Sequence, residues 1–430
     1  MKANPHERAE TSVIDAAMRV GETLCETAHW HESRCNWVGR SPRESTSDLP
    51  TTPTVAALGP EVYTGTAGIA LFLSHLHART GIEAFRRTAL GAIRQALGRS
   101  ENVPPAMAVS FYSGLVGIAY AAVRVGRLID DSELIESGMQ LAHRAVSAPD
   151  SDRLLDVIGG NAGAIAPLLW LAKIEGGESL QTSSLDLATE LAAAATKRDG
   201  TWCWNNDRAS GTGVGPTPLC GFAHGASGMG LALIEIGVRY QQQDWIEGGL
   251  AAFRYEDQLY DAGRGNWPDL RELTARGGAP HDRQHASFMV AWCHGAAGIG
   301  LARLRAHQLL PQHRADLQIG VEQALRTTAA HLQSVPADFD ASPCHGRGGL
   351  AETLLHASAT LDDRQYADQA FGMWEHTVRT RSVGQPWSVG VASGRNNPSL
   401  MLGLAGIGYA LLRACSPDEV PSILLIDPDR

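Results

Sequence analysis

The sequence predicts an all-α protein whose helices form a double-layered toroid, with seven inner helices surrounded by seven outer helices. Three observations lead to this fold class. A Gly-x-x-Gly motif followed by small and aliphatic residues occurs seven times, amphipathic segments with helical spacing lie between the motifs, and few segments resemble β-strands. Each repeat therefore forms one helical unit, and stacking seven units in a ring buries a continuous core.

The motifs recur at intervals of 46 to 70 residues. Glycine permits positive φ or close backbone approach, so each motif predicts a turn that leads into a helix of about three turns. The segments that follow, such as GIALFL and GIGYALL, are apolar on nearly all sides, which predicts buried inner helices. The first glycines of the seven motifs are Gly65, Gly114, Gly160, Gly225, Gly295, Gly346 and Gly403.

The segments between the motifs predict the outer layer. Residues 81–97 (GIEAFRRTALGAIRQAL) and 133–146 (ELIESGMQLAHRAV) alternate aliphatic and polar residues at helical spacing. We expect a single domain over residues 1–430, with an N-terminal helical entry segment at 1–50 and the repeats at 60–415. Two long loops, at 196–222 and 260–288, are expected to enter the same rim as the turns, where long loops are usually functional.

Composition excludes several classes of protein. The net charge is -10 and no block of Lys and Arg stands out, which argues against nucleic-acid binding. The sequence contains no run of eighteen apolar residues, so a membrane span is not expected. The N-terminus lacks the apolar region of a signal peptide. The seven cysteines are dispersed and odd in number, which favours free thiols or a metal site in a reducing cytoplasm over a disulfide framework.

Three residues of the fifth and sixth repeats form a candidate metal site. Cys293, Cys344 and His345 occupy equivalent or adjacent places in repeats that should be neighbours in the ring. Thiolate and imidazole are the ligands that zinc prefers, and three protein ligands leave a fourth position open, as in catalytic sites. Alternatively, the two cysteines are small packing residues before glycine turns. His294 is expected at the rim near the substrate, because adjacent side chains diverge.

Two further residues are candidates for proton transfer. His224 directly precedes the first glycine of the fourth motif, one residue later than the cysteines of the fifth and sixth motifs. Histidine titrates near neutral pH, which suits it to proton transfer. Asp156 precedes the third turn by four residues and could instead simply cap that turn. Repeats one and two offer no chemical side chains and are expected to be structural. Four other histidines carry no comparable context: His31, His281, His285 and His307.

With the motifs DVIGGNAG, GFAHGASG, AWCHGAAGIG and PCHGRGGL, nearly the whole chain resembles the lanthionine synthetase C-like cyclases. The closing segment, NPSLMLGLAGIGYALLRACSPDEVPSILLIDP, resembles the C-terminal cyclase half of bifunctional class II lanthipeptide synthetases. The resemblance implies an α-toroid of seven plus seven helices. It also assigns Cys293, Cys344 and His345 as zinc ligands and His224 and Asp156 as the acid–base residues.

The chain departs from these relatives in two ways. An arginine that some members carry shortly before the first zinc cysteine is Met289 here. The dehydratase of the bifunctional enzymes has no counterpart in the sequence, so a separate dehydratase is the expected partner.

The resemblance implies a zinc-dependent lanthipeptide cyclase. Such an enzyme adds a peptide cysteine thiol across the double bond of a dehydroalanine or dehydrobutyrine in the same dehydrated precursor peptide, which forms (methyl)lanthionine thioether rings. Two alternatives remain open: addition of glutathione or another soluble thiol to dehydrated proteins, and a non-catalytic scaffold that binds the peptide for a separate dehydratase. Six-unit toroid glycosidases are disfavoured by the count of seven and by the few acidic residues in the motifs.

Overall fold

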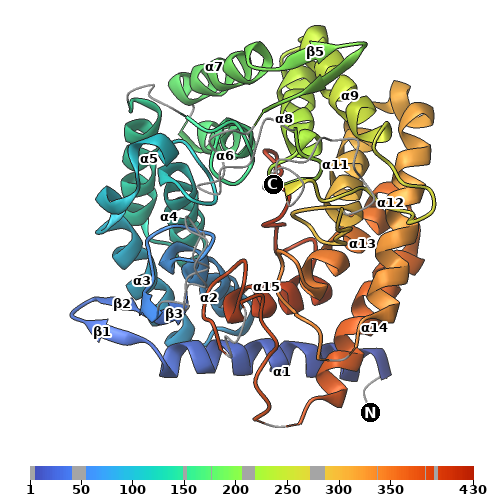
Figure 1. The fold of residues 1–430 in the computed structure, drawn as a ribbon. Coiled ribbons are helices and arrows are strands. Elements are labelled where there is room, and N and C mark those ends of the chain that lie inside the picture. The colour runs from blue at the N-terminus through green and yellow to red at the C-terminus, as the bar shows by residue number, and fades with distance from the viewer. Residues whose placement is uncertain are drawn as a thin grey trace.

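The computed structural model describes residues 5–40, 55–148, 153–175, 177–205, 218–271, 286–336, 338–382, 384–391 and 396–430. Within these residues, seven inner helices form a closed ring, since each contacts the next and α15 contacts α2 (Figure 1). The inner helices are α2 (Thr66–Thr80), α4 (Leu115–Ile129), α6 (Asn161–Glu175), α8 (Ala226–Arg239), α11 (Ala296–Leu309), α13 (Arg347–Leu361) and α15 (Leu404–Cys415).

Seven outer helices surround this ring within the described residues, which confirms the predicted double-layered toroid. Six of them pack on the inner helix that precedes them in the chain, and α1 packs on α15. The outer helices are α1 (Pro5–Glu26), α3 (Glu83–Leu97), α5 (Ser132–Val146), α7 (Glu178–Ala193), α9 (Gln243–Asp257), α12 (Arg314–Ser334) and α14 (Arg364–Thr380). The N-terminal helix therefore supplies the seventh outer position.

Within the described part of the entry segment expected at 1–50, residues 5–40, α1 is the only helix. Three short strands follow the helix, and residues 41–54 lie outside the described part of the chain. Three antiparallel two-stranded sheets decorate the toroid: β1 (His29–His31) with β2 (Arg34–Asn36), β3 (Val38–Arg40) with β4 (Val55–Ala57), and β5 (Thr196–Arg198) with β6 (Thr201–Cys203). Short 3-10 turns lie at Ser100–Asn102, Pro105–Met107 and Pro311–His313. Parts of both long loops, with His281 and His285, lie outside the described residues.

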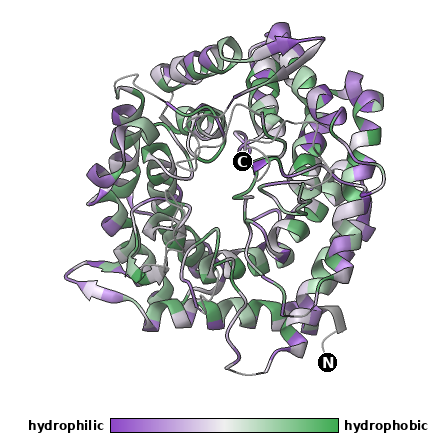
Figure 2. Cartoon of the chain, in the orientation of Figure 1, coloured by the Kyte–Doolittle hydropathy of each residue, from purple (hydrophilic) through white to green (hydrophobic). Residues whose placement is uncertain are grey.

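The two layers differ in how apolar they are. Helix α2 is buried continuously from Thr66 to Leu76, whereas α3 buries one face through residues such as Phe85, Ala89 and Ile93. Figure 2 shows hydrophobic residues predominating on the inner helices and hydrophilic residues on the outward faces of the outer helices. The alternation that predicted the outer layer is therefore the pattern of helices buried on one side. No helix in the described ranges is long and apolar enough to cross a membrane.

The second glycine of each motif lies where no side chain fits. In all seven motifs, a Cβ atom there would lie 1.6 to 2.3 Å from the carbonyl oxygen of the residue six positions earlier. Gly117 has the shortest of these distances, 1.6 Å to the oxygen of Phe111. Close approach to this carbonyl is therefore the shared reason for the second glycine. Among the first glycines, Gly295 differs by its positive φ of 84°.

We expect Gly117→Ala to destabilise the protein by at least about 1–3 kcal/mol, the usual cost of overpacking, because the contact is with rigid backbone. Gly372 is the matched control, since it lies inside α14 with nothing within 4 Å of its missing Cβ. There alanine should stabilise by about 0.5–1 kcal/mol through helix propensity. Urea unfolding of both variants measures the difference. Equal stabilities would contradict the close-approach explanation.

Backbone hydrogen bonds join the turns into a belt at one end of the ring. The amide of Cys293 donates to the Cys344 carbonyl (3.3 Å), and that of Cys344 donates to the Met401 carbonyl (3.1 Å). The Met401 amide in turn donates to the Tyr63 carbonyl (3.0 Å), and the Tyr63 amide donates to the Tyr112 carbonyl (2.9 Å). On the other side of Cys293, the belt continues through Ala223 and Val157. Residues far apart in sequence are thus fixed side by side at this rim.

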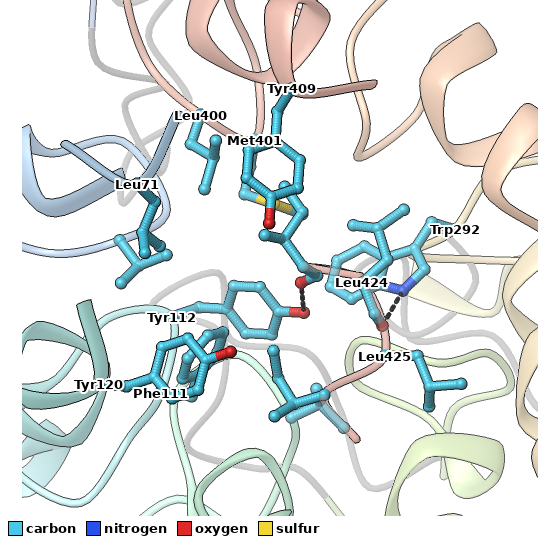
Figure 3. Close-up of a cluster of buried hydrophobic side chains, with 14 of the residues drawn as sticks. Leu71, Phe111, Tyr112, Tyr120, Trp292, Leu400, Met401, Tyr409, Leu424 and Leu425 are labelled. Carbon is cyan, nitrogen blue, oxygen red and sulfur yellow. Dashed lines mark hydrogen bonds between the residues drawn. The ribbon is translucent and has the colours of Figure 1, made fainter. Parts of the chain in front are cut away.

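The C-terminal segment, residues 416–430, enters the centre of the toroid, where Figure 1 shows the C-terminus. The Tyr112 hydroxyl donates to the Ile423 carbonyl (2.8 Å), and the Trp292 indole N–H donates to the Leu424 carbonyl (3.0 Å), as Figure 3 shows. Leu424 itself is buried. The segment therefore packs directly beneath the turns of the rim.

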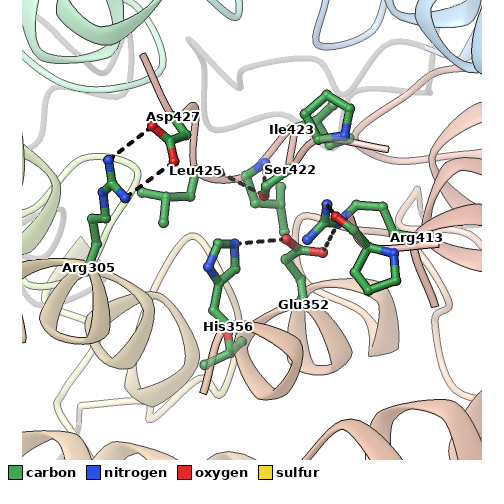
Figure 4. Close-up of polar contacts among 12 residues, drawn as sticks. Arg305, Glu352, His356, Arg413, Ser422, Ile423, Leu425 and Asp427 are labelled. Carbon is green, nitrogen blue, oxygen red and sulfur yellow. Dashed lines mark hydrogen bonds and ion pairs between the residues drawn. The ribbon is translucent and has the colours of Figure 1, made fainter. Parts of the chain in front are cut away.

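Ion pairs anchor the same segment from the inner helices (Figure 4). The Arg305 guanidinium on α11 lies 3.1 Å from an Asp427 carboxylate oxygen. Arg413 on α15 pairs with the buried Glu352 of α13 (2.6 Å) and also donates to the Val420 carbonyl. Burial opposes ionisation of Glu352, but the Arg413 charge outweighs it and lowers the pKa of that carboxyl. The pair is therefore charged at neutral pH, and its Arg413 fixes the C-terminal segment at Val420.

A candidate metal centre beside an acid–base pair

Two cysteines and a histidine converge at the rim. One potential ligand atom from each of Cys293, Cys344 and His345 lies within 4.8 Å of the other two. Both cysteines occupy the position two residues before the first glycine of their motifs, and the amide-to-carbonyl bond between them holds the two turns together. Both cysteines are buried. The repeat alignment that singled out these residues thus corresponds to physical proximity.

The orientation of His345 suits metal coordination. Its Nε2–H donates to the Gly390 carbonyl (2.9 Å), and Asp340 Oδ2 lies 3.9 Å from the same nitrogen. A metal-binding histidine commonly uses its second ring nitrogen in this way, which leaves Nδ1 to face the thiols. A Cβ at residue 390 would lie 2.8 Å from Nε2, so glycine is needed there. Gly390 lies in a loop without any motif, so no sequence pattern predicted this role.

The electrostatics of the three groups fit a divalent cation. The shared hydrogen bond with Cys344, together with burial, raises the pKa of Cys293 well above its ordinary value. Burial opposes charge on His345, but its contacts with Cys293 and Gly390 prevail and raise the pKa of His345 to about 9. Buried thiolates thus require positive charge beside them, and two sulfurs with one imidazole form a donor set that zinc prefers. The described residues add no fourth histidine, cysteine or carboxylate to this group.

Tyr63 of the first repeat also reaches this cluster. Its hydroxyl lies 2.9 Å from the Sγ of Cys344. Burial and the two nearby thiols raise the pKa of Tyr63 well above its ordinary value, so the hydroxyl stays protonated and can donate. The expectation that repeats one and two are purely structural therefore missed this residue. Tyr63 precedes its first glycine by two residues, as Cys293 and Cys344 do, so the repeat alignment contained the signal.

His224 and Asp156 form a hydrogen-bonded pair. Nδ1 of His224 donates to Oδ2 of Asp156 (2.6 Å), while Oδ1 of Asp156 accepts from the Gly159 amide (2.7 Å). Asp156 is therefore both the turn cap and the partner of the histidine, so the two interpretations of this residue are compatible. Burial lowers the pKa of His224, but the Asp156 carboxylate outweighs that effect and raises it overall. This bond holds Nδ1 in place and fixes the orientation of the His224 ring.

His294 connects the pair to the metal cluster. Its ring stacks on that of His224, with centroids 5.9 Å apart, and it follows Cys293 directly in the chain. His294 thus lies among the rim residues with its side chain buried, and its expected nearness to the substrate stays a prediction. Burial and the nearby Arg271 lower its pKa to about 3, which keeps the ring neutral. Among the described residues, its Nε2 has no hydrogen-bond partner.

A guanidinium group lies beside the site although residue 289 is methionine. Nη2 of Arg271 lies 3.3 Å from Sδ of Met289 and 2.7 Å from Oδ2 of Asp269. Its charge acts on both Cys293 and Cys344. Arg271 belongs to the second long loop, which was expected to enter this rim, but sequence analysis did not single it out.

Comparison with known proteins identifies the family of the chain. The family model described as "Lanthionine synthetase C-like protein" matches residues 56–425. The chain belongs to the lanthionine synthetase C-like family. Among solved structures, one described as "Nisin cyclase" is 17% identical, with a TM-score of 0.59 over 82% of this chain and 88% of that chain, which shows a shared fold. An unsaturated glucuronyl hydrolase specific for heparin is 14% identical, with a TM-score of 0.47 over 86% of this chain and 96% of that one, too weak a likeness to support an argument.

The site of this lanthionine synthetase C-like protein is open on one side. The side chains of His224, His345 and Arg271 are 26%, 31% and 41% exposed, whereas the two cysteines and Asp156 are buried. A bound molecule would therefore meet the imidazoles and the guanidinium first, with the thiols behind them.

Proposed function

We propose that the protein is a zinc-dependent lanthipeptide cyclase. It would form (methyl)lanthionine rings by adding a cysteine thiol to a dehydroalanine or dehydrobutyrine of the same dehydrated precursor peptide. The observation that carries this proposal is the convergence of Cys293, Cys344 and His345 within 4.8 Å, at the rim that also holds the His224–Asp156 pair. Family membership supports this class of reaction.

Cys293, Cys344 and His345 would hold the zinc ion. The bound ion would supply the Lewis acidity that favours the thiolate form of a peptide cysteine, whose pKa is otherwise near 8.5. The three residues leave the fourth coordination position of a catalytic zinc site for the substrate.

His224 is the candidate proton donor of the reaction. As the new S–C bond forms at the β-carbon, the π bond breaks and its electron pair moves toward the α-carbon and the adjacent carbonyl. The α-carbon then takes up one proton, while the thiol has given up its own, so the net result is addition of S–H. The Asp156 carboxylate fixes Nδ1 of His224 and favours the protonated state of the imidazole, which can then serve as the proton donor.

Arg271 would stabilise the negative charge that develops on the substrate carbonyl. Its guanidinium is partly exposed on the open side of the site and is held in place by Asp269. Positive charge positioned where negative charge appears in the transition state is a major source of rate enhancement. The guanidinium of Arg271, which lies beside Met289, would play this role. Met289 itself carries no charge and would not.

The proposed setting is a reducing cytoplasm, because all seven cysteines are free thiols in the structure. The substrate would be a dehydrated precursor peptide made by a separate dehydratase.

Mass spectrometry tests the proposed reaction directly. A peptide that carries one cysteine and one dehydroalanine should lose its free thiol without any change in mass, faster than the same peptide alone. Added glutathione identifies the alternative reaction, because its addition would raise the mass by one glutathione. Binding of the peptide without either change would instead support the non-catalytic scaffold.

A further inference from the structure

A hydroxyl group from the first repeat lies beside the sulfur of Cys344. Tyr63, 281 residues away in the chain, places its Oη 2.9 Å from Sγ. The backbone fixes this contact, because the Cys344 amide donates to the Met401 carbonyl and the Met401 amide donates to the Tyr63 carbonyl. The two side chains are therefore held together by the belt of hydrogen bonds around the rim.

The ring of Tyr63 is fixed from beneath. Tyr112 packs against it edge to face, with centroids 6.2 Å apart and an interplanar angle of 81°. Tyr112 is in turn held by the C-terminal segment, since its hydroxyl donates to the Ile423 carbonyl (Figure 3). A chain of contacts thus runs from the Cys344 sulfur through Tyr63 and Tyr112 to the C-terminal segment.

A buried hydroxyl that only filled space would be costly, because burial without a hydrogen bond is unfavourable. The hydroxyl of Tyr63 meets a sulfur that must accumulate negative charge when it serves as a metal ligand. A hydrogen bond to a charged acceptor stabilises that charge and fixes the direction of the sulfur. A phenylalanine would keep the packing and remove only this bond.

We propose that Tyr63 is a positioning residue of the metal centre, whose hydroxyl donates to the Cys344 thiolate and sets how strongly this sulfur binds the ion. This inference rests on the zinc site of the proposed function. It adds a residue of the first repeat to that site.

The test compares Tyr63→Phe with Tyr409→Phe. Tyr409 is the matched control, because its hydroxyl also donates a hydrogen bond, to the Pro421 carbonyl of the C-terminal segment, away from the thiols. Zinc affinity is measured by competition with a chromophoric chelator, using the metal alone. Loss of an outer hydrogen-bond partner costs about 10–100-fold in metal affinity, so Tyr63→Phe should bind zinc at least about tenfold more weakly. Tyr409→Phe should match the wild type.

Cobalt substitution gives a second measurement that loose packing alone would not reproduce. Without its hydrogen bond, the thiolate lone pair rises in energy, so the sulfur-to-cobalt charge-transfer band of Tyr63→Phe should move to longer wavelength. Unchanged affinity and an unchanged band, or equal weakening in Tyr409→Phe, would overturn the inference while leaving the zinc site intact. A wild-type protein that binds no zinc would instead overturn the proposed function.

Discussion

Replacing Cys344 by alanine should abolish zinc retention and slow thioether formation by at least about a hundredfold. The variant loses one of three ligands, a larger change than loss of an outer partner, which already costs up to about a hundredfold in affinity or activity. Cys344 also accepts a hydrogen bond from Tyr63 and shares one with Cys293, and the substitution removes both of these contacts. Elemental analysis and the mass-neutral loss of peptide thiol measure the two effects on the same sample.

Cys203 provides the control for this substitution. It is a free, partly exposed thiol on β6, outside the cluster, so Cys203→Ala should keep both zinc and activity. Full activity in Cys344→Ala, with or without metal, would show that the two rim cysteines are packing residues.

Asp156→Asn and His224→Ala should each reduce turnover by about 10²–10⁴-fold, the usual contribution of general acid–base catalysis, while zinc remains bound. Asparagine can still accept from the Gly159 amide through its side-chain oxygen, so the turn should survive the change. What it lacks is the negative charge that raises the pKa of His224. Loss of zinc in either variant would mean that the pair supports the metal cluster instead of transferring a proton.

The pH dependence provides a sharper test of the same pair. His224 must be protonated to donate, so activity should fall as the pH rises through its raised pKa. The groups that face it are Asp156, the neutral His294, Cys293 and Arg271, of which Asp156 and Cys293 favour the charged imidazole. Removing the Asp156 charge should therefore move this fall to lower pH in the residual activity of Asp156→Asn. A fall at an unchanged pH would exclude His224 as its origin.

The repeats made the toroid and most of the site predictable. Equivalent positions in a ring of similar units lie at the same rim, so the motif alignment alone brought Cys293, Cys344 and His345 together. The same alignment places Tyr63 with the cysteines, but a tyrosine in an apolar motif resembles a core residue until its partner is known.

Other features depend on contacts between distant segments, which local sequence patterns do not specify. Helix α1 closes the outer layer on α15 at the opposite end of the chain. Gly390 and Arg271 reach the site from loops of irregular length, and such loops follow no repeat spacing. The buried ring of His294 stacks on that of His224, a contact between two repeats that the motif spacing does not specify.

The decisive measurement is the zinc content of the wild-type protein, purified without chelators and analysed for metal beside the peptide assay. We expect one zinc per chain, and parallel loss of zinc and ring closure when the metal is stripped. A metal-free protein that closes thioether rings at the full rate would contradict it.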